Sequence, residues 1–319
     1  MKNIAILMGG SSNEKFISIK SANTIYSYLD TNKYLGFKVN CIDIKTFYVD
    51  LYDKNIQINR SDFSFEYKNK KIKFDMVYNM IHGAPGENGD LCQYFEKLSI
   101  PYSSCKKVPS QLTFNKLKCN LQLKKIGYNV PIIYNNIEDV IYPCIVKPVN
   151  GGSSLGVQKV NSKKFIHKAI NHAKTIDKKT IIEEFINGRE LTCAVFNFKN
   201  NTQSLTALPI TEIMSQNDIF DYNAKYQGQS KEITPANITL AVKDKIENIS
   251  KKVYLDFDLN GVIRIDFILN KETPYIIEIN TIPGFSKESI VPQMLKCAKI
   301  PIKQFIDWHI RSILNKPQN

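Results

Sequence analysis

The chain has 319 residues, 43% of them hydrophobic, and a formal net charge of +13 at neutral pH. That length and composition predict two or three packed domains and exclude an intrinsically disordered chain. No apolar run approaches the ~18 residues that a membrane-spanning helix needs, so we expect no membrane insertion.

The N-terminal sequence and the cysteines favour a cytoplasmic protein. The stretch MKNIAILMGGSS has no long apolar region and no cleavage site, so it predicts a first β-strand rather than a signal peptide. The seven cysteines are scattered and lack CxxC spacing, which favours reduced thiols over a disulfide framework or a zinc site.

The basic charge is a weak indication of nucleic-acid binding, because the lysines are spread along the chain with only small clusters such as Lys68–Lys73. A basic balance also suits an enzyme whose ligands are phosphates and carboxylates. We therefore expect no nucleic-acid partner, and a basic nucleic-acid-binding protein remains a distant alternative.

The N-terminal third alternates strands with helices, which is typical of an α/β unit. A strand, the Gly9-Gly10 turn and a helix open it. The polar segment Tyr52–Lys73 predicts either an extra hairpin or a loop excursion, and its role stays open. The predicted strands are Ile4–Met8, Phe37–Ile42 and Met76–Ile81, and the helices are Ile17–Leu29, Asp90–Leu98 and Ser110–Lys125.

Later strands pair with one another, which indicates α+β units. The segment Ile219–Gln229 is polar, aromatic and without periodicity, so it is predicted as a loop. The predicted strands are Ile145–Lys147, Gly156–Val160, Ile181–Phe185, Leu191–Phe198, Leu205–Thr211, Val262–Leu269 and Tyr275–Asn280, and the helices are Lys163–Lys174, Ile238–Tyr254 and Ile302–Leu314.

The most informative stretch, GVIRIDFILNKETPYIIEINTIPG, spans residues 261–284 and contains two paired strands around a short polar turn. Alternation places Arg264 and Asp266 on one face of the first strand, and Glu278 and Asn280 on one face of the second. Buried charge is costly unless it is paired or metal-bound. The residues therefore predict a hard divalent cation held by Asp266, Glu278 and Asn280, with Arg264 facing an anion. The competing interpretation is a plain hairpin in which Arg264 forms an ion pair with Asp266 or Glu278.

Four further motifs suit phosphate or substrate binding, each with a purely structural alternative. KPVNGGSSLG (147–156) combines a strand-end lysine with glycines and serines that can surround an anion, although the GxxxxGK[ST] pattern is absent. HGAPGENGD (82–90) suits an anion at a helix N-terminus, or is a capping loop. IIEEFINGRE (181–190) could present backbone groups and a carboxylate to adenine and ribose, and DYNAKY (221–226) could close as a lid. Surface glutamates and a surface turn are their structural alternatives.

Taken together, these motifs resemble the D-alanine–D-alanine ligases of the ATP-grasp superfamily. The resemblance runs from GGSSNE near the start to PGFSKESIVP near the end, and six motifs occur in the family's order. It implies an α/β and α+β architecture with the ATP-grasp fold: an N-terminal Rossmann-like α/β domain (1–104), followed by two α+β domains (105–186 and 187–319) that sandwich ATP.

The resemblance also implies roles for individual residues. Glu14 matches the glutamate that anchors the ammonium of the first D-alanine, and Ser153 and Tyr226 match its hydrogen-bonding partners, which tie the lid to the site. Arg264 and the Gly284 backbone N–H match the donors that stabilise the tetrahedral intermediate. The residues that match ATP-phosphate contacts are Lys116, Lys147, Lys225, Ser153 and Ser154, and those that match adenine and ribose contacts are Glu183, Phe185, Ile186 and Glu190. The ligands of two Mg²⁺ or Mn²⁺ ions are matched by Asp266, Glu278 and Asn280. Substrate contacts are matched by His82, Ser289 and Ile290, with Ser289 binding the second carboxylate.

The implied activity is ATP-dependent ligation of two D-alanine molecules through an acylphosphate, for peptidoglycan precursor synthesis, by a homodimer. A few positions depart from the family pattern. Phe16 and Ile290 lie near the amino-acid pockets, and Asn115 stands where aspartate is usual. A D-alanine–D-serine or D-alanine–D-lactate ligase is therefore the closest alternative, although Tyr226 favours an amine acceptor. A non-catalytic nucleotide-binding paralogue is a further alternative, and a dinucleotide oxidoreductase is weak because GxGxxG is absent.

Overall fold

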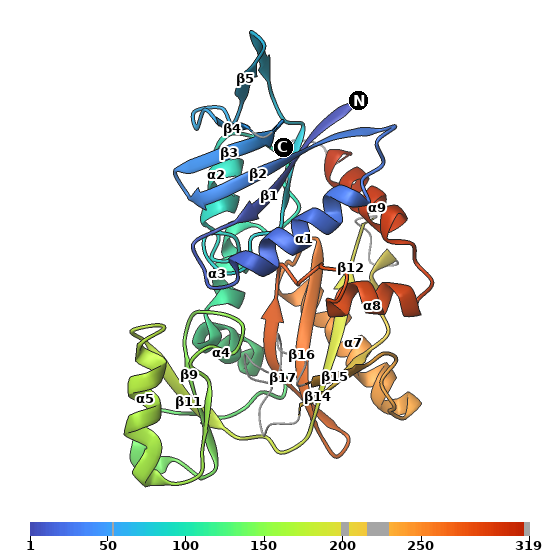
Figure 1. Cartoon of the computed structure of the whole chain (residues 1–319). Helices are drawn as coiled ribbons and strands as arrows, with labels where there is room; N and C mark the ends of the chain where they lie inside the picture. Colours follow the sequence, from blue (N-terminus) through green and yellow to red (C-terminus); the bar gives the residue numbers. More distant parts are fainter. Residues whose placement is uncertain (53, 199–203, 216–229, 316–319) are drawn as a thin grey trace.

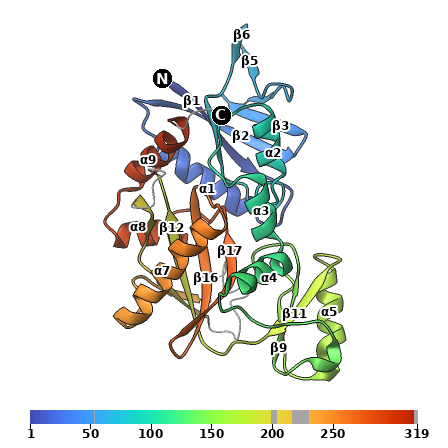
Figure 2. The same ribbon diagram turned by 180° about the vertical axis from the view of Figure 1, so that it is seen from behind.

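The computed structural model describes residues 1–52, 54–198, 204–215 and 230–315. Three sheets of four or more strands follow one another along the described chain, each with helices packed against it (Figure 1). The view from behind shows the small sheet with α5 (Ile166–Lys174) lying apart from the N-terminal sheet, with the C-terminal sheet between them (Figure 2).

The N-terminal sheet has the strand order β4-β3-β2-β1-β7, with β1 parallel to both of its neighbours. Alternate residues of β1 point to opposite faces, and both faces are buried. Ile4 and Ile6 pack with helix α1, whereas Ala5 and Leu7 pack with helix α2. This confirms the predicted α/β opening. The elements are β1 (Lys2–Gly9), α1 (Lys15–Ser27), β2 (Tyr34–Asp43), β3 (Thr46–Leu51), β4 (Lys54–Gln57), β7 (Met76–Asn79) and α2 (Asp90–Lys97).

The polar segment Tyr52–Lys73 contains a hairpin, which was one of the two structures predicted for it. Strands β5 (Phe65–Tyr67) and β6 (Lys70–Ile72) pair in antiparallel fashion and project from the N-terminal sheet (Figure 1). At its base, Phe63 and Phe65 are fully buried and pack edge-on or tilted against Phe37 and Phe74. Aromatic contacts of this kind anchor the hairpin on the sheet.

The single helix predicted over Ser110–Lys125 is wrong. Two helices, α3 (Lys107–Phe114) and α4 (Lys116–Ile126), are separated at Asn115, whose backbone is extended (φ −90°, ψ 100°). The Asn115 side chain caps α4 by accepting from the Lys118 N–H at 2.9 Å. An N-cap residue has non-helical backbone angles, so this cap requires the break. It places Lys116 at the first position of α4.

The small four-stranded sheet has the order β10-β9-β11-β8, with all described pairs antiparallel. Helix α5 covers one face and forms a separate small core with it. The predicted helix Lys163–Lys174 begins as a 3₁₀ turn, Lys163–Phe165, before the α-helix. The strands are β8 (Ile133–Tyr134), β9 (Cys144–Pro148), β10 (Gln158–Val160) and β11 (Thr180–Glu184), and a 3₁₀ turn covers Ile137–Asp139.

The C-terminal sheet has the order β15-β14-β12-β16-β17, and β13 pairs with β12. One face packs against α7, whereas the other joins the core that contains α8, α9, α1 and β1. The predicted strand Leu205–Thr211 is instead two short strands on either side of a break. The elements are β12 (Arg189–Phe196), β13 (Thr206–Ala207), β14 (Thr211–Ser215), β15 (Ser230–Ile233), α7 (Leu240–Asp256), β16 (Val262–Asn270), β17 (Thr273–Asn280), α8 (Ile290–Cys297) and α9 (Ile302–Leu314).

Candidate active site

Two adjoining cavities gather the predicted site residues. The first, of about 400 Å³, lies between the small sheet and the C-terminal sheet, and the second, of about 300 Å³, lies where residues 14–87 meet the C-terminal sheet and the start of α8. Gly151, Gly152 and Glu278 line both. The first contains Lys116, Lys147, Ser154, Glu183, Phe185, Ile186, Glu190 and Asp266, and the second contains Glu14, His82, Ser153, Arg264, Asn280, Gly284, Ser289 and Ile290. Ser153, predicted for both roles, thus lies in the second cavity alone.

A buried ion pair dominates the first cavity. The Lys147 ammonium lies 2.5 Å from the Glu183 carboxylate, and both side chains are almost fully buried. Strands β9 and β11 pair so that Lys147 lies opposite Ile181, two residues from Glu183, and diagonal neighbours on one face can touch. Beside them, the Lys159 ammonium lies 4.2 Å from the centre of the Phe185 ring. An apolar ring, a cation and a carboxylate therefore line one wall, which suits a nucleotide.

The metal-type residues lie together on the β16–β17 hairpin. Asp266 is the register partner of Glu278, and Arg264 is the partner of Asn280, so these side chains share one face. The hairpin has an irregularity directly after Asp266, a position where bulges commonly re-aim side chains.

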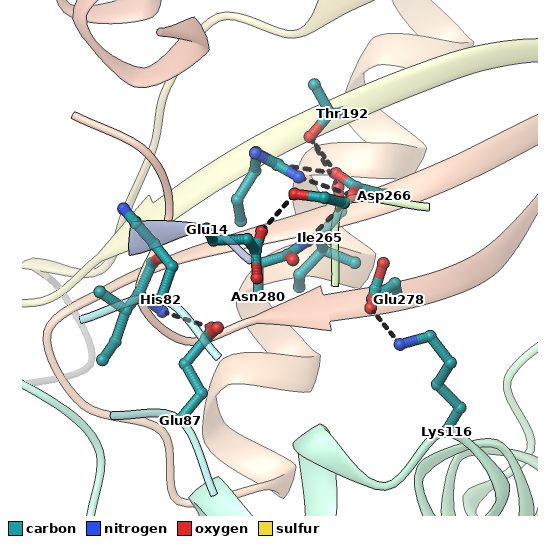
Figure 3. A network of polar contacts seen from close by, with 12 residues as sticks. Glu14, His82, Glu87, Lys116, Thr192, Ile265, Asp266, Glu278 and Asn280 are labelled. Atoms are coloured by element: carbon teal, nitrogen blue, oxygen red, sulfur yellow. Dashed lines mark hydrogen bonds and ion pairs between the residues drawn. The ribbon is translucent and has the colours of Figure 1, made fainter. Parts of the chain in front are cut away.

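Asp266 accepts several hydrogen bonds (Figure 3). Arg264 donates to both carboxylate oxygens at 2.9 Å, the Thr192 hydroxyl donates at 2.6 Å, and the Asn280 amide donates at 2.9 Å. The ion pair of the competing interpretation is therefore present. It does not exclude a cation site, because two carboxylates and an amide still converge there. No three His, Cys, Asp or Glu side chains in the described ranges form a metal-type group.

Lys116 connects the metal-type residues with the glycine-serine loop. Its ammonium lies 2.8 Å from the Glu278 carboxylate (Figure 3) and donates to the Gly151 carbonyl at 2.5 Å. Burial lowers the pKa of Lys116, but Glu278 and other carboxylates outweigh that effect and leave the pKa raised, so the lysine stays charged. A permanent positive charge at the junction of the two cavities suits a phosphate group.

Glu14 reaches the glycine-serine loop from the N-terminal domain. The Ser153 hydroxyl donates to Glu14 at 2.5 Å. Gly152 permits this approach, because a Cβ atom there would lie 2.4 Å from the Glu14 carboxylate oxygen. The predicted pair of Glu14 and Ser153 is thus in contact.

His82 holds the loop that follows β17. Its Nδ1 lies 2.7 Å from the Ile282 carbonyl oxygen, and its Nε2 lies 3.3 Å from the Ser21 hydroxyl. Because a carbonyl can only accept, Nδ1 carries the proton and Nε2 accepts from Ser21. Burial lowers the pKa of His82, which favours this neutral form. Ser21 in turn accepts from the Phe285 N–H at 3.0 Å, so His82 and Ser21 fix the backbone on both sides of Gly284.

Gly284 and Ser289 lie side by side in the lining of the second cavity. A Cβ atom on Gly284 would lie 3.0 Å from the Ser289 hydroxyl oxygen. That hydroxyl accepts from the Ser286 N–H at 3.0 Å. Ile290, the first residue of α8, is buried beside it. A backbone N–H, a hydroxyl and a helix N-terminus therefore face the same space, which suits an anionic group.

The sequence analysis missed Glu87 and Thr192, although Glu87 lies inside the HGAPGENGD motif. Glu87 accepts from the Gly83 N–H at 2.7 Å and from the Ile282 N–H at 3.2 Å. Burial raises its pKa to about 8. Lys225 and Tyr226, predicted for the lid, lie outside the described residues.

Comparison with known proteins matches nearly the whole chain to one family. A family model described as "D-ala D-ala ligase N-terminus" matches residues 3–105, and one described as "D-ala D-ala ligase C-terminus" matches residues 120–311. The chain belongs to the D-alanine–D-alanine ligase family. The predicted family is confirmed, and the oxidoreductase alternative falls away.

Individual relatives agree with this family. A D-alanine–D-alanine ligase from Flavobacterium johnsoniae is 43% identical over 95% of this chain and 96% of its own length. Among solved structures, the VanG D-Ala:D-Ser ligase from Enterococcus faecalis is 28% identical, covers 98% of this chain and 99% of its own, and has a TM-score of 0.84. A D-alanyl-alanine synthetase A from Vibrio cholerae covers 99% of both chains with a TM-score of 0.85 and 25% identity. These likenesses confirm the predicted ATP-grasp fold.

Proposed function

We propose that this ligase joins two D-alanine molecules at the expense of ATP, forming D-alanyl-D-alanine for peptidoglycan precursor synthesis. The observation that carries the proposal is the junction of the two cavities. A lysine-lined cavity suited to a nucleotide meets, at Gly151, Gly152 and Glu278, a cavity in which Glu14 and Arg264 can bind an amino acid. Phosphate transfer to a carboxylate requires this adjacency.

In the first step, the carboxylate of one D-alanine attacks the γ-phosphate, which gives D-alanyl phosphate and ADP. Lys116 and Lys147 hold the phosphates, together with Lys225 of the lid segment. Glu14, oriented by Ser153, binds the ammonium of the first D-alanine. These residues position the reactants and neutralise charge, as is usual in phosphoryl transfer.

In the second step, the amine of the other D-alanine attacks the acyl carbon, and phosphate leaves. Arg264 and the Gly284 N–H face the tetrahedral oxyanion, and Ser289 binds the second carboxylate. The lid segment with Tyr226 closes over the site, because water would hydrolyse the acylphosphate.

Asp266, Glu278 and Asn280 fit Mg²⁺ or Mn²⁺, because they offer only oxygen ligands of the kind that these hard cations prefer. The cation would supply positive charge at the transferred phosphate. Asp266 and Glu278 already pair with Arg264 and Lys116, so a cation would share each carboxylate with a cationic side chain.

The remaining features of the proposal concern the whole protein. We place it in the cytoplasm as a homodimer with three domains, 1–104, 105–186 and 187–319. In the described ranges, no helix is long and apolar enough to cross a bilayer. D-Serine or D-lactate as the second substrate is the alternative that the family keeps open, since a solved relative carries the name of a D-Ala:D-Ser ligase.

The test is phosphate release from Mg-ATP with D-alanine alone, followed by D-alanine with D-serine or D-lactate. Release with D-alanine alone, together with D-alanyl-D-alanine, is the expected result. Release only with a mixed pair would keep the mechanism and change the acceptor. No release with any pair would reject the proposed function in favour of a non-catalytic paralogue.

A further inference from the structure

The second amino acid enters as an ammonium ion, and it must lose a proton before its nitrogen can attack. Among the residues that the structure describes, five carboxylates line the second cavity, and four of them are engaged elsewhere or exposed. Glu14 accepts from Ser153, Glu87 accepts two backbone N–H groups, Glu278 pairs with Lys116, and Glu288 is exposed. The fifth carboxylate belongs to Glu232.

Glu232 is half-buried on β15, the strand that follows the lid segment. One of its oxygens, Oε2, accepts from the Gln293 amide at 2.5 Å. The other, Oε1, has no hydrogen-bond partner among the residues that the structure describes. Gln293 also donates to the Glu288 carbonyl at 3.0 Å, which fixes the amide. Glu232 is therefore held by one oxygen, with the other available to a ligand.

The partner of Glu232 places it beside the acceptor-binding group. Gln293 follows Ser289 by four residues on α8, and residues four apart share one face of a helix. Arg264, which faces the oxyanion in the proposed mechanism, is close enough to Glu232 to stabilise its charge. Glu232 thus lines the same cavity as Ser289 and Arg264, and it contacts helix α8 about one turn after Ser289.

We propose that Glu232 binds the ammonium group of the second D-alanine and removes a proton from it, an inference that rests on the proposed ligase function. The ammonium gives one proton to the Glu232 carboxylate, and the neutral nitrogen forms a bond to the acyl carbon. The bond between that carbon and the phosphate oxygen breaks, and phosphate leaves with the electron pair. The second proton on nitrogen passes to the leaving phosphate.

The electrostatic surroundings suit a base. Burial raises the pKa of Glu232, whereas the Gln293 hydrogen bond and Arg264 lower it. A raised pKa brings a carboxylate closer to the pKa of the proton that it must accept. Other charged groups among the described residues surround Glu232. Lys231 lies beside it, and Glu212 on β14 pairs with Arg189. Around the cavity lie Glu14, Lys20, Glu87, Glu278 and Glu288.

The test separates the two chemical steps in the full-length enzyme. D-Alanyl phosphate is trapped with hydroxylamine, which is a neutral nucleophile at pH 7 and needs no base, and dipeptide is measured in parallel. We expect Glu232→Gln to lower dipeptide turnover by about 10²–10⁴-fold while hydroxamate formation stays within about threefold of wild type. The exposed Glu66→Gln is the matched control and should change neither.

Other outcomes overturn the inference. A parallel fall in both products would make Glu232 a structural residue, and unchanged dipeptide turnover would remove it from the reaction. A wild-type enzyme that forms no hydroxamate would instead reject the proposed function itself, so the two failures are distinguishable.

A second variant covers the case in which Glu232→Gln does not fold. Gln293→Ala keeps the carboxylate but removes the hydrogen bond that stabilises its charge. The pKa of Glu232 should therefore rise, and the acidic limb of the dipeptide pH–rate profile should move to higher pH while the hydroxamate profile does not. An unmoved acidic limb would overturn the proposed role.

Discussion

At the scale of single residues, Arg264 has one observed partner and one proposed partner. It forms an ion pair with the Asp266 carboxylate, and it is proposed to stabilise the oxyanion of the tetrahedral intermediate. The bidentate pair with Asp266 keeps its guanidinium fixed at the cavity wall. A donor that is fixed before the reaction stabilises charge without having to reorganise. The ion pair and the catalytic role are therefore compatible.

Removing this guanidinium separates the two roles. We expect Arg264→Ala to lower turnover by about 10²–10³-fold, because an oxyanion donor is lost. Mn²⁺ affinity, followed by electron paramagnetic resonance, should stay equal or increase, since Asp266 loses its competing cation. The exposed Arg60→Ala serves as the control. Near-normal turnover in Arg264→Ala would reject the assigned role.

Glu87 predicts a dependence of stability on pH. Its folded pKa of about 8 lies above the ordinary value of 4.5, so between these values the folded protein holds a proton that the unfolded chain has lost. The stabilisation is complete below the lower value and is lost as pH rises through the higher one. Glu87→Gln cannot ionise at this position, so its Tm should fall less steeply than that of wild type between pH 5 and 8. The difference in slope corresponds to up to about 1.4 kcal/mol of unfolding free energy per pH unit.

The slope, rather than the absolute Tm, is the measurement that tests Glu87. Glutamine has one acceptor oxygen for the two backbone N–H groups, so the variant should be less stable than wild type at low pH, where the wild-type Glu87 carboxyl is protonated. Parallel curves of Tm against pH for the two proteins would contradict the raised pKa. Glu66→Gln, on the exposed hairpin, controls for general charge effects.

At the scale of elements, Asn115 shows how a cap places a functional lysine. Asn115→Ala should cost about 1 kcal/mol of unfolding free energy, because the Lys118 N–H loses its acceptor. Asn115→Asp keeps the acceptor and adds a negative charge at the helix N-terminus, so its stability should match or exceed wild type. KM for ATP should rise in the alanine variant alone, since Lys116 opens α4. Equal stability of the alanine variant would rule out the cap.

Sequence periodicity predicts long helices and strands well, but it predicts interruptions within them poorly. It gave β1, α2, α7 and the β16–β17 hairpin, whose patterns span whole elements, and it joined α3 to α4 because apolar spacing continues across Asn115. Helix α8 was not predicted: Pro292 interrupts its pattern, yet proline is tolerated in a first helical turn. In the site, motif residues were found from the sequence, whereas Thr192 and Glu232 come from strands without a motif. Only the sheet pairing brings Thr192 to Asp266 and Glu232 to the second cavity.

At the scale of the whole molecule, the two cavities depend on the N-terminal domain to different degrees. Every described residue that lines the first cavity lies at position 116 or later, whereas Glu14, His82 and Glu87 line the second. The amino-acid cavity is therefore completed only when the N-terminal sheet is docked on the C-terminal helices. One shared core contains β1, α1, α8 and α9, so apolar burial provides much of that docking.

Asp307 on α9 adds polar contacts between the C-terminal helices and the N-terminal sheet. It is buried and accepts from the Tyr34 hydroxyl at 2.9 Å and from Lys33 at 3.2 Å, and it pairs with Arg311 at 2.5 Å. Asp307→Ala leaves the Tyr34 hydroxyl without its acceptor, which should cost about 1–3 kcal/mol. Asp307→Asn keeps an acceptor oxygen, so it should lose less.

The kinetic consequence of Asp307→Ala should fall on one substrate. A loosened N-terminal domain displaces Glu14 but no residue of the first cavity, so KM for D-alanine should rise several-fold while KM for ATP stays near wild type. Steady-state kinetics with each substrate varied in turn, beside denaturant unfolding, measures both effects. An equal rise in the two constants would mean that the domains respond as one unit, and an unchanged KM for D-alanine would show that core packing alone positions Glu14.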